Sequence, residues 1–253
     1  MEQQRTRFRA RTIGARTLDV LNHAVRGEPP AGHSGEWAEL AEAGIATGQH
    51  ELEPRWREVL GEASAAPITL EVVSRMGRAG MRSLISLTPR IGLSNTERRR
   101  LGITDTEVVV EAVEDAFEIA LFDPGLIWPA VQRVLPPSHL VRAEGSLASP
   151  REEQTVAVIR DVPERSALPP QVLSDLAGAD VEVSLALQVD SGREVPFVTA
   201  RHWLEGAQQQ LLEVRLLEGQ AQVVRVPAGT IADEVAWLAV GAFDLHSRTR
   251  AAS

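Results

Sequence analysis

In two stretches of the chain, the spacing of hydrophobic residues changes from the helical period of about 3.6 residues to the strand period of 2. Around residues 52–137, a proline-led segment with apolar residues at helical spacing gives way to segments in which every second residue is apolar, and an amphipathic helix closes the stretch. The stretch at about 168–243 repeats this order. The repetition predicts an α+β fold of internally duplicated helix–antiparallel strands–helix units around a central sheet, related by a pseudo-twofold axis. Residues 17–243 then form a single domain with two lobes.

Three helices are predicted ahead of the first strands. Thr17 is placed to cap the first helix and Ser34 to cap the second, while Pro54 occupies a first helical turn, where proline is tolerated. Before them, residues 1–16 carry five arginines with weak alternation, which indicates either a basic N-terminal arm or an edge strand. At the other end of the chain, residues 244–253 are interpreted as a polar tail.

Alternation of apolar and polar residues predicts the strands. In the first lobe they are expected at 68–74, 81–87, 106–113 and 117–121, with turns at Gly77–Gly80 and at Glu114-Asp115. Residues 88–105 are predicted to be a polar connection. In the second lobe we expect a helix at 172–176 and strands at 180–189, 195–204, 211–217 and 223–226, with a hairpin turn at Ser191-Gly192. Residues 154–161 fit either a strand or a short helix.

Composition narrows the class of protein. With 253 residues, 43% of them hydrophobic and 24% charged, the chain is typical of a soluble globular protein with a substantial core. A net charge of −9 argues against a binder of nucleic acid or of anionic membranes. Cysteine is absent, which excludes disulfides and thiolate chemistry. Because the sequence shows neither a secretory signal nor a membrane-spanning run, we expect a cytoplasmic protein without membrane insertion.

Patterns that would indicate a reaction centre are sparse. The six histidines are scattered without metal-ligand spacing, so no metal site is expected. Gly32-His33-Ser34-Gly35 has the wrong spacing for a hydrolase elbow, and the Gly77–Gly80 turn lacks the lysine of a phosphate-binding loop. We therefore expect no catalytic residue and no cofactor, and we favour a binding scaffold over an enzyme. An enzyme whose site is assembled from distant residues stays open as an alternative.

The sharpest local feature is a run of arginines. Arg98, Arg99 and Arg100, followed by Leu101, lie in the predicted polar connection and are candidates for docking an acidic partner surface, because arginine binds carboxylates through two hydrogen bonds. The competing interpretation is a solvated loop. Trp203, at the end of a predicted strand, is either an interface residue or a core residue. The other tryptophans fall on helix faces and are predicted to be core, namely Trp37, Trp56, Trp128 and Trp237.

Three stretches of the chain carry a family resemblance. They are residues 18–30, which end on a proline pair; residues 40–48 with the following Leu52-Glu53-Pro54; and the segment from Asp190 through Trp203 to Gly229. In order and spacing they resemble the EspG family, the cytosolic chaperones of actinobacterial type VII (ESX) secretion. The likeness spans most of residues 17–240. The chain departs from the family pattern in a shorter segment between Pro30 and Trp37 and in its arginine-rich start.

This resemblance implies a quasi-twofold fold and a non-enzymatic chaperone. The implied partner is a secreted helical protein of the PE/PPE or a related ESX type, whose helical tip the chaperone binds and keeps soluble before export. A surface with an apolar centre and a polar rim suits such a tip. The alternative is an EspG-like structural or regulatory scaffold that has lost client binding and self-associates, for example as a homodimer.

Overall fold

An antiparallel sheet organises the protein, whose computed structural model describes residues 9–28, 31–104, 108–146, 153–159, 178–190, 192, 195–217 and 220–251. From edge to edge the strands are β1 (Arg9–Ile13), β5 (Val108–Phe122), β4 (Gly92–Ile103), β3 (Ala79–Leu87), β2 (Ile68–Met76), β7 (Val181–Val189), β8 (Phe197–Gly206), β9 (Gln210–Leu217), β10 (Gln220–Val226) and β6 (Gln154–Ile159). β2 and β7 pair at the centre, with Val72 opposite Leu185. Together with the helices, this sheet makes the fold α+β, as predicted.

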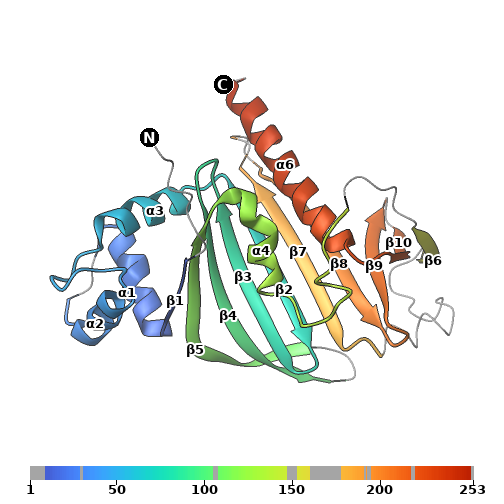
Figure 1. The fold of residues 1–253 in the computed structure, drawn as a ribbon, viewed down its shortest axis with the longest axis horizontal. Helices are drawn as coiled ribbons and strands as arrows, with labels where there is room; N and C mark the ends of the chain where they lie inside the picture. Colours follow the sequence, from blue (N-terminus) through green and yellow to red (C-terminus); the bar gives the residue numbers. More distant parts are fainter. Residues whose placement is uncertain are drawn as a thin grey trace.

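Helices α4 (Ile127–Gln132) and α6 (Thr230–Ala251) cross one face of the sheet, here called the front face (Figure 1). A short 3-10 turn, η1 (Pro124–Leu126), leads into α4. Alternate residues of the two central strands point to this face and form the first hydrophobic core, among them Ile68, Leu70, Val72, Val183, Leu185 and Leu187. The hydroxyl of Ser74 donates to the carbonyl of Val134 over 2.6 Å, which ties the end of α4 to the centre of the sheet.

Helices α1 (Ala15–Val25), α2 (Ser34–Glu42) and α3 (Pro54–Ser64) form a second core with the β1–β5 edge of the sheet. They gather at that end of the molecule (Figure 1). Ile13, Ile119 and Leu121 contribute to this core from the opposite face, the back face. The first and second cores therefore lie on opposite faces of one sheet.

The start of α1 differs from the prediction. The helix begins at Ala15, and Thr17 is a buried residue of its first turn that hydrogen-bonds Glu39 of α2. The amide of Ala15 donates to Asp115 Oδ1 of β5 over 2.6 Å, and the amide of Gly14 donates to Glu39 Oε1 over 2.7 Å. Thr17 is thus not the N-cap, because carboxylates from two remote elements take that role.

Two segments predicted to be irregular belong to the sheet. Residues 92–103 form β4, which pairs with β3 from Gly92 to Arg100, so the predicted polar connection at 88–105 is wrong. Glu114-Asp115 does not form a hairpin turn, because β5 continues through both residues. In both cases strand pairing that the local sequence does not reveal is decisive, along β4 itself and on either side of Glu114-Asp115 in β5.

Other predicted elements are confirmed near their expected bounds, including the edge strand β1, the strands of the second lobe and the helices that begin at Ser34 and Pro54. Ser34 is not the cap of α2, because it is the first residue of the helix and His33 stands at the N-cap position without a side-chain hydrogen bond. Residues 154–159 resolve as the strand β6. β7 and β8 pair from Val189–Phe197 onward, so the predicted hairpin turn at Ser191-Gly192 falls in the connection between them, and Ser191 lies outside the described residues. The helix expected at 172–176 also lies outside them.

The last helix corrects two further expectations. α6 continues through residues 244–251, so most of the predicted polar tail is part of this helix. Trp237, on this helix, is 61% exposed, although helical spacing predicted it in the core. Trp37 and Trp56 are buried as predicted, and Trp128 is partly buried against the first core. A helix that lies on a sheet buries only one stripe of residues, and Trp237 falls outside that stripe.

Candidate partner-binding site

The arginine run lies within β4, so its side chains alternate between the two faces of the sheet. Arg98 stands opposite Met81 and points to the front face, as does Arg100, whereas Arg99 points to the back face. Arg99 Nε donates to Glu97 Oε1 over 2.6 Å, and Arg100 Nε lies 3.7 Å from Glu111 Oε2. Arg98 has no hydrogen bond or ion pair within the described part of the chain. The predicted cluster is therefore divided, and Arg98 is its free member.

A large bulge in β5 lies opposite Arg98. Glu97 pairs with Phe117 and Arg99 pairs with Val113, so three residues of β5 stand against the single position of Arg98. Bulges of this kind bend a strand and re-aim side chains, and they are common next to binding sites. Here the bulge also carries Asp115, the carboxylate that caps α1.

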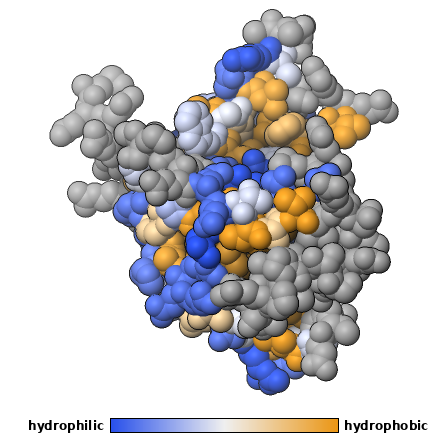
Figure 2. Space-filling model, turned by 90° about the vertical axis from the view of Figure 1, so that its right-hand side faces the viewer, coloured by the Kyte–Doolittle hydropathy of each residue, from blue (hydrophilic) through white to orange (hydrophobic). Residues whose placement is uncertain are grey.

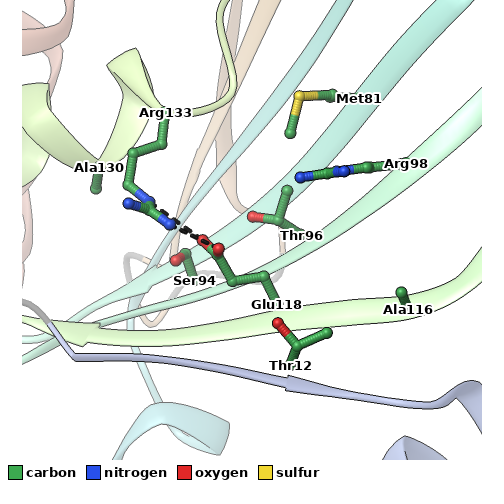
Figure 3. Close-up of a pocket in the computed structure, with 9 residues that line it drawn as sticks. All are labelled: Thr12, Met81, Ser94, Thr96, Arg98, Ala116, Glu118, Ala130 and Arg133. Atoms are coloured by element: carbon green, nitrogen blue, oxygen red, sulfur yellow. Dashed lines mark hydrogen bonds and ion pairs between the residues drawn. The ribbon is translucent and has the colours of Figure 1, made fainter.

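Arg98 lines a pocket of about 300 Å³ on the front face beside α4 (Figure 3). The other lining residues come from β1, β3, β4, β5 and the end of α4, and are Thr12, Met81, Ser94, Thr96, Ala116, Glu118, Ala130 and Arg133. Figure 3 shows the guanidinium groups of Arg98 and Arg133 entering the pocket from opposite sides. The pocket thus brings together side chains that lie far apart in the sequence, from Thr12 to Arg133.

The two guanidinium groups have different surroundings. Arg133 is held by Glu118 through two hydrogen bonds, Nε–Oε1 at 3.1 Å and Nη2–Oε2 at 2.6 Å. Thr96 Oγ1 lies 2.8 Å from Ser83 Oγ, which fixes a hydroxyl group in the pocket wall. An unpaired guanidinium beside hydroxyl groups and a methionine is suited to bind a carboxylate, or the free carbonyl oxygens at the end of a helix.

The remaining two predicted residues are not available to a partner. Leu101 is buried, and its side chain packs over Gly80, where an added Cβ would lie 3.0 Å from Leu101 Cδ1. Trp203 is fully buried in the first core. The core alternative for Trp203 is therefore confirmed, and the placement of either residue at an exposed interface is wrong. Both are large apolar side chains, which gain free energy by leaving water.

A second cavity, the β8/β9 opening, is lined by residues of β8 and β9 and has a volume of about 1040 Å³. In its wall, burial lowers the pKa of His202, whose Nδ1 lies 2.7 Å from Ser184 Oγ. Arg215 hydrogen-bonds the carboxylates of Glu153 and Glu213, which raises the pKa of its guanidinium. These charges are mutually paired, in contrast to Arg98.

Sequence reasoning missed the residues that surround Arg98. Ser94 and Thr96 precede it at two-residue spacing, so assigning this segment to a strand would have placed all three on one face. Met81 needed the β3–β4 register, and Glu118 and Arg133 needed the packing of α4 on the sheet. No local pattern contains that information.

Two comparisons with known proteins give no match for the chain. No known family model matches it, and a search of curated protein sequences gives no match either. Among the residues that the structure describes, none of the helices has the length and apolar character needed to cross a membrane. The same residues contain no group of three or more histidine, aspartate or glutamate side chains arranged to hold a metal ion.

Proposed function

We propose that this protein is a non-enzymatic cytosolic chaperone of the EspG type, which binds the helical tip of a PPE-like or related type VII secretion substrate and keeps it soluble before export. The observation that carries the proposal is the guanidinium of Arg98, which lines a pocket on the sheet and has no partner among the described residues. The sequence resemblance to the EspG family supports the choice of client class.

The chemistry around Arg98 suits a helical tip. The last turn of a helix has four carbonyl oxygens without intrahelical partners, and they carry the negative end of the helix dipole. Arg98 can donate to such oxygens without giving up an existing bond within the described residues. Met81 lines the same pocket, and Met76 at the neighbouring end of β2 is 44% exposed, so flexible apolar side chains lie on the same face.

We also propose that the two halves of the sheet are copies of one unit. In each half an edge strand, β1 or β6, precedes four consecutive antiparallel strands, β2–β5 or β7–β10. Each set of four is followed by a helix on the front face, α4 or α6, and these two helices lie in contact. The halves meet at the β2–β7 pair. This order supports the pseudo-twofold arrangement that the family resemblance implies.

The test is co-expression with PPE-like helical substrates, followed by size-exclusion chromatography. We expect a one-to-one complex, and we expect Arg98→Ala to weaken it at least tenfold, about 1.4 kcal/mol. The matched control is Arg26→Ala, which removes another exposed arginine without a side-chain partner in the described part of the chain, at the end of α1. This control should leave the affinity unchanged.

Two other outcomes are informative. If the complex forms and Arg98→Ala binds as tightly as the wild type, the chaperone proposal stands and the Arg98 pocket is not the contact. If no substrate co-elutes and the protein runs as a symmetric dimer, the chaperone proposal fails and the self-associating scaffold replaces it.

A further inference from the structure

The sheet is incompletely paired between β8 and β9. These strands pair only from His202–Val214 to Gly206–Gln210. Beyond that point β8 continues along β7 as far as Phe197, whereas β9 continues along β10 as far as Leu217. Within the described residues, the facing edges of residues 197–201 and 215–217 therefore have no strand partner. The β8/β9 opening is lined by both of these edges.

Unpaired strand edges present backbone N–H and C=O groups at the spacing that another strand requires. Five residues of β8 offer about 17 Å of such edge, at 3.3–3.4 Å per residue. Edges of this kind recognise an extended peptide through its main chain and select it through pockets for alternate side chains. The edge of β8, which has no strand partner in the part of the chain that the structure describes, thus specifies the conformation of a ligand and its approximate length.

The two faces of the opening differ in chemistry. By alternation from the His202–Val214 pair, Val198, Ala200 and Leu216 lie on the back face. Val198 is 60% exposed and Leu216 is 74% exposed, which is high for apolar strand residues. Figure 2 views the molecule from the side where β10 and β6 lie in Figure 1, and hydrophobic residues reach the surface there beside hydrophilic ones. An apolar side chain placed here would cover both exposed residues.

On the front face, the opening holds charges that already pair with one another. Arg215 hydrogen-bonds Glu153 and Glu213, and Arg201 Nε lies 3.4 Å from Glu234 of α6. Glu213 is almost fully buried. A further charge brought into this cluster would lack a partner, which is costly away from water. Side chains that face the cluster should therefore be polar and uncharged.

We propose that the β8/β9 opening binds an extended segment of a partner protein, about five residues long, in which β-branched apolar residues alternate with uncharged polar residues. The segment adds as a strand along the free edge of β8, with its apolar side chains over Val198 and Leu216. This site lies across the β2–β7 centre from Arg98, so it does not depend on the proposed chaperone function.

The probe is a fluorescein-labelled heptapeptide that alternates valine with threonine, titrated with the full-length protein and followed by anisotropy. We expect saturable binding, and slower hydrogen exchange of the amides of residues 198–201 and 215–217 in the complex. Val198→Asp and Leu216→Asp should each weaken binding at least tenfold. The matched control Val110→Asp alters a comparably exposed valine on β5 and should leave binding unchanged.

A second peptide, N-methylated at alternate backbone nitrogens, separates strand pairing from side-chain contact. It should not bind, because its donors to the strand edge are removed. The proposal is overturned if the first peptide does not bind with a dissociation constant below about 1 mM, if both peptides bind equally, or if Val110→Asp is as harmful as Val198→Asp. A homodimer that Val198→Asp dissociates and the peptide does not disrupt would assign the opening to a second copy of the chain, which also overturns it.

Discussion

At the scale of single residues, neighbours in the sequence have opposite environments in the sheet. Arg98 lines the front-face pocket without a partner in the described residues, while Arg99 points to the back face and hydrogen-bonds Glu97. Two residues further on, Leu101 is buried. The strand period of two separates these roles, so a run of like charges need not act as one cluster.

The same close packing makes one glycine sensitive to substitution. A Cβ on Gly92 would overlap the ring of Phe122, whose side chain is fully buried. We expect Gly92→Ala to lower the free energy of unfolding by about 1–3 kcal/mol, as overpacking does. Chemical denaturation measures the change.

The matched control for that substitution is Gly61→Ala in α3, where an added Cβ meets no atom within 4 Å. There alanine should be neutral or raise the free energy of unfolding by up to ~1 kcal/mol, because alanine favours the helix. Equal destabilisation by both substitutions would contradict the packing argument at Gly92.

At the scale of elements, the ends of helices and strands are fixed by partners far away in the chain. α1 begins without a cap from its own sequence, and its first amides bond to Glu39 and Asp115. Asp115 occupies the bulge of β5, where a turn had been predicted. The same acidic residue that suggests a turn locally is used as the N-terminal cap of a helix 100 positions earlier.

Removing that cap should weaken α1. We expect Asp115→Ala to lower the free energy of unfolding by about 1 kcal/mol, because it leaves the Ala15 amide unpaired and removes a negative charge from the positive end of the helix dipole. Thermal denaturation provides the measurement. The adjacent Glu114→Ala is the control, since Glu114 is exposed and has no partner within the described residues, and an equal loss there would refute the capping role.

At the scale of the whole molecule, stability is divided between two cores on opposite faces. The first joins β2 and β3 to β7 and α6, and so spans both halves of the sheet. The second joins α1, α2 and α3 to β1 and β5, and shares no residue with the first. Two cores that share no residue can unfold separately. The sheet between them links their unfolding only in part.

We therefore predict two levels of protection in native-state hydrogen exchange. Amides of α1 and α2 should exchange through a local opening with a lower free energy than amides of β2 and β7, which should exchange only on global unfolding. Leu40→Ala, which leaves a cavity in the second core, should speed exchange in α1 and α2 and leave β2 and β7 little changed. A single free energy for all four elements would show instead that the cores unfold together.

The sequence by itself determined the α+β class and the places of the central strands, because these depend on the period of the hydrophobic residues. It also determined the helices that begin at Ser34 and Pro54, because local signals mark the start of a helix. Tertiary structure decided what has no local signal. β4 is a strand because β3 and β5 pair on its two sides. Trp203 is buried and Trp237 exposed because of where each element packs. The Arg98 pocket exists because β1, β3, β4, β5 and α4 meet there. The free energy of strand pairing and the burial of a side chain depend on residues distant in the chain. The pattern within one segment therefore cannot predict them.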